Sequence, residues 1–259
     1  FLMAEFGEER RAFIKINNVP KKMKNAILAI EDRRFYQHKG VDAVGVGRAI
    51  VKNLAGASHE GASTITMQVA RNFFLSSDKT LRRKISEVFL SYKIEKNLNK
   101  DQILELYINQ IYLGQRAYGF GAAALVYYGK PLEKLTLAEC ALLAGLPKAP
   151  SNYNPFTNPK RAIQRQREVL KNMLRYEFID QKAFEEAMNQ TLHFKESRQS
   201  RDLMADHASE MVRQVLYDQY KDDIYTSGIK VYTTIKKANQ EAANEAVLRG
   251  ILDYDRRHE

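Results

Sequence analysis

The first residue able to do chemistry is an acid near the end of a predicted helix. Met23, Ile27 and Glu31 are spaced i, i+4, i+8, so the carboxyl group of Glu31 lies on the apolar side of that helix, at its C-terminal end. Burial and the negative end of the helix dipole both raise a carboxyl pKa toward the range useful for acid–base catalysis. An ion pair with Arg34, three residues on, explains the same position equally well.

A second segment combines a hydroxyl, an amide and a guanidinium. Thr64, Gln68 and Arg71 fall at i, i+4, i+7 behind Ser63, which we expect to cap the helix. A helix N-terminus with these groups on one face suits a phosphate or diphosphate. The alternative is a solvent-facing stripe, although such stripes more often hold Lys and Glu.

A third segment places Arg83 and Lys84 four and three residues before Glu87. In isolation, the plain interpretation is an exposed ion pair worth about 0.2–0.5 kcal/mol. The apolar positions of the same predicted helix, taken as its buried face, are Leu81, Ile85, Val88 and Tyr92.

Two further segments carry polar groups. Glu105 and Asn109 are spaced i, i+4 on a mostly apolar predicted helix, where a structural hydrogen bond is the expected role. The turn-rich loop from Lys148 to Pro155 carries one cation, Lys148.

The elements that must position these residues are mainly helical. Capping and proline signals predict helices that start at or near Pro20, Ser63, Thr80, Asn99 (with Gln102), Thr136 (with Glu139), Asn158 and Asp180. Leu2 to Ile16 reads as a short hairpin or an extended segment, and only Ile229 to Ile235 has the pattern of a strand. A polar stretch at 196–201 predicts a boundary, with one domain over residues 1–195 and a short α+β segment over 196–259.

Composition bounds the class of protein. The 259 residues are 44% hydrophobic with a net charge of +10, which excludes a disordered chain and favours anionic partners. The longest charge-free stretch, Ala117 to Gly129, is too short to span a membrane. The lone Cys140 lies in an apolar run and is expected to be buried. The chain does not begin with Met, and we expect an excised piece of a longer protein whose targeting segment has been removed.

Several other functions fail on their motifs. A relaxed dinucleotide pattern at Gly119 to Ala124 lacks the acidic residue at a strand end that should follow it, and the two S-x-x-K matches at Ser76 and Ser227 lack a K-T-G. Basic clusters at 82–84 and at Lys160, Arg161, Arg165 and Arg167 lack the aromatic ladder of a nucleic-acid groove. The second cluster is predicted to be the solvated face of a helix, and no nucleic-acid partner is expected.

Taken together, four segments resemble the signature motifs of the family 51 peptidoglycan glycosyltransferases, and in particular the glycosyltransferase part of class A penicillin-binding proteins. The segments are Glu31–Gly40, Gly61–Asn72, Arg83–Glu87 and Lys100–Asn109. The resemblance covers residues 1–195, and 196–259 resembles the stretch that leads to the transpeptidase domain of that family. Met67 and Arg71 depart from the family pattern, which often has Gln and Lys there. No transpeptidase motif is present, so no transpeptidase activity is expected.

The resemblance implies a mainly helical, lysozyme-like fold with a smaller membrane-facing lobe. It also implies polymerisation of lipid II into β-1,4-linked glycan strands, with inversion and release of polyprenyl diphosphate. Glu31 would be the acid/base residue, most simply the base toward the acceptor hydroxyl. Glu87 would be a second carboxylate near the diphosphate or near a bridging divalent cation, Mg or Mn, and no organic cofactor is expected.

By the same resemblance, other residues bind substrate or support the site. Those expected to bind substrate are Thr64, Gln68, Arg71, Asn72, Arg83, Lys84, Lys148 and Ser151. Those expected to support it are Asp32, Phe35, His38, Glu105 and Asn109.

The partners implied are lipid II, the growing glycan strand, moenomycin-type inhibitors and a membrane surface. The apolar segment from Val41 to Leu54, with Arg48 and Lys52, suits the membrane interface, although an ordinary core helix fits it as well. The implied location is the extracytoplasmic face of the bacterial cytoplasmic membrane. The rivals are a lysozyme-like hydrolase of glycan strands, a nucleic-acid-binding module and a catalytically silent scaffold for cell-wall assembly.

Overall fold

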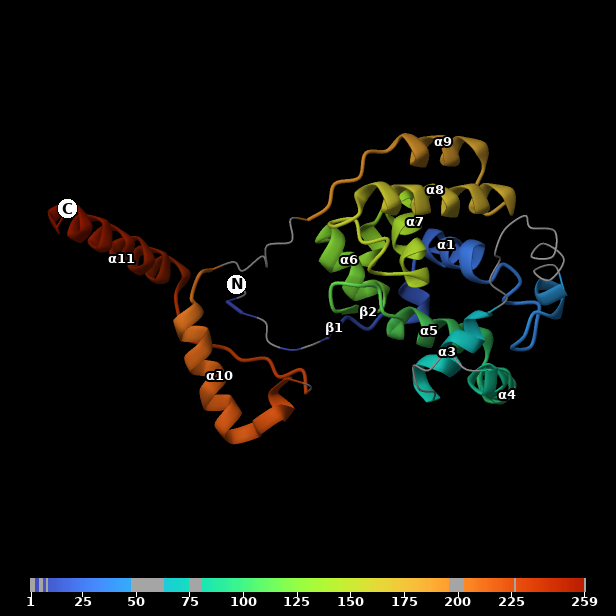
Figure 1. Ribbon diagram of the computed structural model, residues 1–259, viewed down its shortest axis with the longest axis horizontal. Coiled ribbons are helices and arrows are strands. Elements are labelled where there is room, and N and C mark those ends of the chain that lie inside the picture. Colours follow the sequence, from blue (N-terminus) through green and yellow to red (C-terminus); the bar gives the residue numbers. More distant parts are fainter. Residues whose placement is uncertain are drawn as a thin grey trace. The chain divides into compact units, whose positions relative to one another are not determined.

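The computed structural model describes residues 3–4, 7, 9–47, 63–74, 81–195, 203–225 and 227–258. The chain divides into two compact units, one of Glu9–Lys195 and one of Phe1–Glu8 with Glu196–Glu259. Both are mainly helical (Figure 1). The capping signals predicted this for the larger unit, whereas the smaller unit was predicted to be α+β. Among the described residues, none of the helices is long and apolar enough to cross a membrane.

The larger unit holds most of the regular structure. Its helices are α1 (Lys21–Glu31), α3 (Ile65–Phe74), α4 (Leu81–Asn97), α5 (Lys100–Gln110), α6 (Phe120–Tyr128), α7 (Leu137–Gly145), α8 (Pro159–Arg175) and α9 (Gln181–Asn189). Short 3₁₀ turns occur at Ile16–Asn18, Leu132–Lys134 and Leu146–Lys148, and β1 (Arg10–Arg11) pairs with β2 (Ala117–Tyr118).

The predicted helix starts follow from local chemistry. Asn99 and Gln102 form a reciprocal capping box at α5, and Thr136 and Glu139 form another at α7. The side chain of Asp180 accepts a hydrogen bond from Ala183 N–H at 2.8 Å and caps α9. Each side chain satisfies an N–H group that the helix itself leaves without a partner.

The core of the larger unit is built around α7. Every residue from Ala138 to Gly145 is buried, and α1 and α8 pack against this helix (Figure 1). In α1 the predicted apolar face is confirmed, because Met23, Ala26 and Ile27 are buried. Glu31 is the last residue of α1, so this packing fixes the end of the helix that carries it.

A second group consists of α3, α4 and α5, with α3 packed against both of the others. Here the predicted buried face of α4 is wrong in part, because Ile85 is 58% exposed and Tyr92 is 52% exposed. The carboxylate of Glu87 is buried instead. Helical spacing gives the faces of a helix but does not say which face meets the protein.

In its described part, the N-terminal segment is extended, with the short strand β1, and forms no hairpin. β1 pairs in parallel with β2, Arg10 opposite Ala117 and Arg11 opposite Tyr118. Further along, Asn109 Oδ1 accepts from Ile14 N–H at 2.8 Å and Glu105 Oε2 accepts from Ile16 N–H at 2.6 Å. Two side chains of α5 thus hold the backbone that leads into α1.

The smaller unit contains α10 (Asp206–Tyr220), a 3₁₀ turn at Lys221–Tyr225 and α11 (Lys237–His258). The strand predicted over Ile229–Ile235 is wrong, since these residues belong to no helix or strand. Most of their side chains are exposed, and no strand lies beside them in the described part of the chain. A strand pattern becomes a strand only where a partner supplies its hydrogen bonds.

Candidate active site

A pocket of about 470 Å³ opens in the larger unit where the end of α1, the start of α3 and the side of α8 meet. Its lining is rich in charged and amide groups. The lining residues are Ala29, Ile30, Glu31, Asp32, Arg33, Asp42, Gly45, Ser63, Thr64, Gln68, Arg71, Pro147, Lys148, Arg165, Asn172 and Tyr176.

Glu31 is one of three carboxylates that line this pocket, with Asp32 and Asp42. Gln68 Nε2 donates a hydrogen bond to Glu31 Oε2 at 2.7 Å. Burial raises the pKa of the Glu31 carboxyl, whereas the bond from Gln68 and the charges of Arg165 and Arg71 lower it. The net effect is a raised pKa of the Glu31 carboxyl, in the direction that favours acid–base catalysis. The alternative ion pair does not form, because Arg34 faces Asp42 at 3.8 Å.

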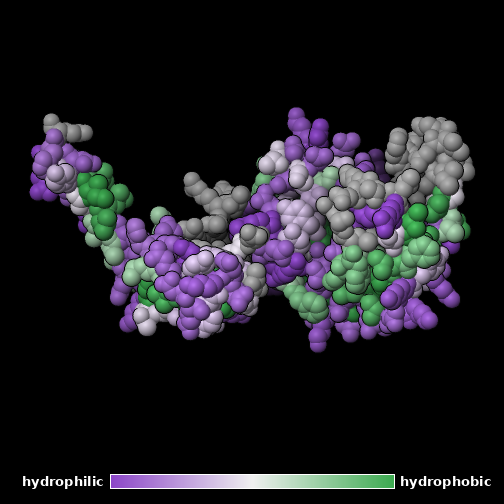
Figure 2. Space-filling view, turned by 60° about the horizontal axis from the view of Figure 1, so that its bottom comes forward, coloured by the Kyte–Doolittle hydropathy of each residue, from purple (hydrophilic) through white to green (hydrophobic). Residues whose placement is uncertain are grey.

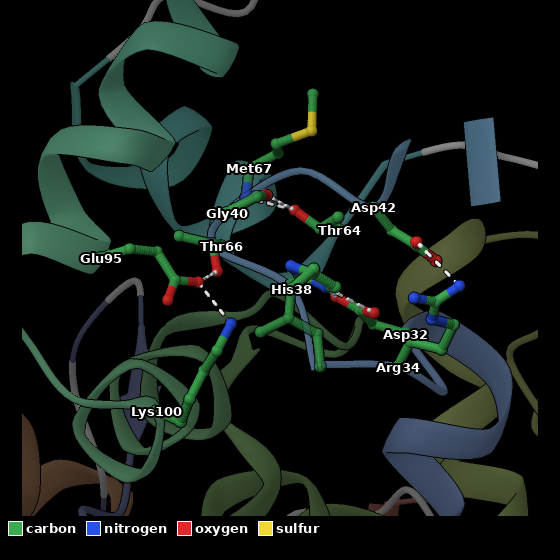
Figure 3. Close-up of polar contacts among 11 residues, drawn as sticks. Asp32, Arg34, His38, Gly40, Asp42, Thr64, Thr66, Met67, Glu95 and Lys100 are labelled. Carbon is green, nitrogen blue, oxygen red and sulfur yellow. Dashed lines mark hydrogen bonds and ion pairs between the residues drawn. The ribbon is translucent and has the colours of Figure 1, made fainter. Parts of the chain in front are cut away.

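Asp32, the residue after Glu31, links α1 to α3. Its two carboxylate oxygens each lie 3.0 Å from Nε2 of His38 (Figure 3). Oδ2 also accepts from Ile65 N–H at 3.0 Å. The carboxylate is therefore placed at the N-terminus of α3, where an anion is favoured. The ring of Phe35 is buried against His38 with the ring centroids 6.3 Å apart. These three residues fix the loop that follows Glu31.

The start of α3 is held by Thr64 and not by Ser63. Thr64 Oγ1 accepts from Met67 N–H at 3.2 Å and donates to the carbonyl oxygen of Gly40 (Figure 3). Ser63 accepts a bond from Lys84 Nζ at 2.7 Å. The side chain of Met67 is buried and does not line the pocket.

Glu87 is buried between two cations. Its Oε2 is 2.9 Å from Lys84 Nζ and its Oε1 is 3.2 Å from Arg83 Nε, with only 1% of the side chain exposed. The interpretation as an exposed ion pair is wrong. Both oxygens already face cations, and the described residues contain no group of three or more His, Cys, Asp or Glu that could hold a metal ion. With both oxygens so engaged, the Glu87 carboxylate does not fit a divalent cation as a further partner.

Lys100 and Glu95 form a further polar network. Glu95 Oε1 accepts from Thr66 Oγ1 and from Lys100 Nζ, both at 2.6 Å (Figure 3). Lys100 Nζ lies 4.4 Å from the centre of the Phe35 ring. This network joins α3, α4 and α5 to the loop after Glu31.

Some predicted site residues do not reach the pocket. Thr64, Gln68, Arg71 and Lys148 line it, whereas the other predicted binding residues do not, namely Asn72, Arg83, Lys84 and Ser151. Asn72 and Ser151 are exposed, and Lys84 approaches the lining through Ser63. Glu105 and Asn109 hold the N-terminal segment. Residues 48–62, which include Gly61, Ala62 and much of the Val41–Leu54 segment, lie outside the described residues.

Sequence reasoning missed the wall that α8 contributes. Arg165 and Asn172 of α8 line the pocket, with Tyr176 directly after the helix, and Arg165 is buried although its cluster was predicted to be solvated. A signal was present. Ala162, Arg165 and Val169 fall at i, i+3, i+7 on the buried face of α8. This spacing indicates that Arg165 is buried, although its charge alone favours exposure.

The chain is similar to proteins that are already known. Residues 2–174 match the Transglycosylase family. The chain is 54% identical over 252 residues to penicillin-binding protein 1A of Neisseria lactamica, covering 97% of this chain and 32% of that protein. It is 50% identical over 262 residues to penicillin-binding protein 1A of Escherichia coli K12, covering 99% of this chain and 30% of that protein.

A solved structure is also similar. The crystal structure of penicillin-binding protein 1A from Haemophilus influenzae matches with a TM-score of 0.58 and 32% identity, over 99% of this chain and 28% of that one. The chain thus spans about a third of the length of the relatives it matches.

Proposed function

The chain belongs to the transglycosylase family, and from this premise we propose that it polymerises lipid II, a disaccharide-pentapeptide carried on a polyprenyl diphosphate. The observation that carries the proposal is Glu31 held by Gln68 in a pocket that also contains Arg71 and Lys148. Transfer of a sugar from a diphosphate requires a base for the acceptor hydroxyl and cations for the leaving diphosphate, and this pocket contains both.

In the proposed reaction, Glu31 accepts the proton of the acceptor 4-hydroxyl. That oxygen forms a bond to the anomeric carbon of the growing chain while the bond from this carbon to the diphosphate oxygen breaks. The electron pair leaves with the diphosphate, and attack from the opposite side inverts the anomeric centre. Arg71, Lys148 and the hydroxyl group of Ser63 are the groups available to stabilise the leaving charge.

In the proposed function, Glu87 holds the side chains of Lys84 and Arg83 in place. Its buried carboxylate holds Lys84 and Arg83, and Lys84 also bonds to Ser63 on the pocket lining. Because a buried carboxylate without its partners is costly, the three side chains keep one arrangement. Glu87 thus acts on the pocket through Lys84 and Ser63, without touching the reacting atoms.

The proposed setting is the extracytoplasmic face of the cytoplasmic membrane, where the lipid tail of the substrate remains in the bilayer. Exposed apolar side chains gather on α3 and α4 (Figure 2). They are Phe73, Phe74, Ile85, Phe89 and Tyr92, with Phe89 71% exposed. An apolar patch on a protein with a net charge of +10 suits an anionic bilayer surface. Moenomycin-type inhibitors are expected to compete with the substrate for the pocket.

The test is incubation of the chain with labelled lipid II in detergent, with products separated on a gel. Wild type should give glycan polymer and Glu31→Gln none, while Glu133→Gln, an exposed position outside the pocket, should polymerise like wild type. Polymer from Glu31→Gln would refute the assigned base.

A lysozyme-like hydrolase is the rival, and Arg71→Gln separates the two functions. This variant should lose polymerisation because a cation near the leaving diphosphate is gone, whereas cleavage of preformed glycan strands involves no diphosphate. Cleavage of strands by wild type, with no polymer from lipid II, would refute the transferase.

A further inference from the structure

The pocket contains a cation that the proposed reaction has not used. Arg165 of α8 is 8% exposed and lines the same pocket as Glu31. Two other arginines of this helix, Arg161 and Arg167, are exposed. A buried guanidinium costs stability unless it is paired and hydrogen-bonded, so its position calls for a reason.

Several contacts hold Arg165 in one place. Nη1 is 2.8 Å from Glu168 Oε2, Nε donates to the carbonyl oxygen of Gly145 at 3.4 Å, and the guanidinium carbon lies 5.8 Å from the centre of the Tyr153 ring. A Cβ at Gly145 would lie only 2.8 Å from Arg165 Cγ. α7 therefore leaves room for the stem of this side chain, and the cation is fixed before any substrate binds.

The charged surroundings of Glu31 show what this cation does. Arg165 from α8 and Arg71 from α3 lower the pKa of the Glu31 carboxyl against the effect of burial, whereas Asp32 raises it. Of these charges, Arg165 has the largest effect. The other groups that face Glu31 are the buried Tyr107 of α5 and, around the pocket, Arg33, Asp42 and Lys148.

The two arginines differ in what else they do. In the proposed function Arg71 faces the leaving diphosphate, so its charge is shared with the substrate. Arg165 is paired with Glu168, a half-exposed residue whose charge water screens. Its effect on Glu31 is thus available when an anionic substrate arrives, which is when the base is hardest to keep ionised.

We propose that Arg165 is a positioning residue for the general base, a fixed cation on α8 that keeps the Glu31 carboxylate ionised in the substrate-filled pocket. This inference rests on the proposed function. It assigns to α8, which carries no motif of the resemblance, a direct share in setting the pH range of the reaction.

The experiment measures kcat/KM for polymerisation against pH in wild type, Arg165→Gln, Arg165→Lys and the matched control Arg167→Gln. Loss of the cation raises the pKa of Glu31, so the acid limb for Arg165→Gln should move to higher pH by about one unit. Below that limb, activity should fall about tenfold, with recovery at higher pH. Arg165→Lys should shift less, and Arg167→Gln should not shift.

Two results would overturn the inference. One is an Arg165→Gln profile whose acid limb does not move. If kcat/KM is lowered equally at every pH, Arg165 has only a structural role, and if the profile is unchanged, it has no role. The other is an Arg165→Lys shift as large as that of Arg165→Gln. If circular dichroism shows that Arg165→Gln is unfolded, Arg165→Met carries the test, because it keeps an apolar stem beside Gly145 and removes the charge. Its acid limb should also move to higher pH, and an unmoved limb overturns the inference. Absence of polymer from wild type would instead refute the proposed function.

Discussion

Replacement of Asp32 by alanine should destabilise the larger unit more than the loss of any single exposed contact in that unit. The carboxylate bonds to Nε2 of His38 and to Ile65 N–H, all at 3.0 Å and all buried. Each buried donor left without an acceptor costs about 1–3 kcal/mol. The lost anion at the N-terminus of α3 adds roughly 0.3–2 kcal/mol. For the two donors and the dipole together we expect about 2–8 kcal/mol, a large share of a typical stability of about 5–15 kcal/mol.

The measurement is urea unfolding followed by circular dichroism. Asp32→Asn keeps one oxygen for Ile65 N–H and should cost less, about 1–2 kcal/mol. Asp101→Ala is the matched control, because Asp101 is exposed and accepts one bond, from Tyr36 at 2.8 Å, so its loss should cost about 1 kcal/mol or less. If Asp32→Ala costs no more than Asp101→Ala, the link between α1 and α3 is not what stabilises this region.

Three further predictions concern other parts of the chain. Burial raises the pKa of the Cys140 thiol to about 12, so at pH 8 iodoacetamide should modify the native protein at least about 100-fold more slowly than the urea-unfolded protein, as read by mass spectrometry. Gly119 has φ +84° and a Cβ there would lie 2.8 Å from an α5 carbonyl oxygen, so Gly119→Ala should lower stability by about 2 kcal/mol or more in thermal unfolding. Gly250→Ala, in open space on α11, should instead stabilise by about 0.5–1 kcal/mol, and the opposite order would refute the steric argument. Phe89→Asp should weaken binding to anionic lipid vesicles in a flotation assay, whereas Phe13→Asp, equally exposed outside the patch, should not.

Local signals predicted much of the fold. The capping boxes at Asn99 and Thr136 involve residues three apart, so their chemistry is complete within one turn of the chain. The pairing of β1 with β2 could not be predicted in this way, because it joins Arg10 to Ala117 across the unit. The strand over Ile229–Ile235 failed for a related reason, since propensity without a partner forms no ladder.

The site was predictable where one helix carries the chemistry and not where several meet. Thr64, Gln68 and Arg71 share a face of α3, and spacing alone places them together in the pocket. Glu87 and Arg165 look like surface charges by residue type. Their burial depends on which face of α4 or α8 meets other helices, and that is a property of packing between helices distant in the sequence.

The attachment of the N-terminal segment has a mechanical consequence. Arg10 N–H donates to the carbonyl oxygen of Arg116 at 2.7 Å, and the backbone of Ile14 and Ile16 is bonded to Asn109 and Glu105 of α5. A pull on the chain at β1 would load these bonds together, in shear along the segment, before any tension reached α1. These hydrogen bonds would therefore bear the force, and the helix that ends at Glu31 would remain unstretched.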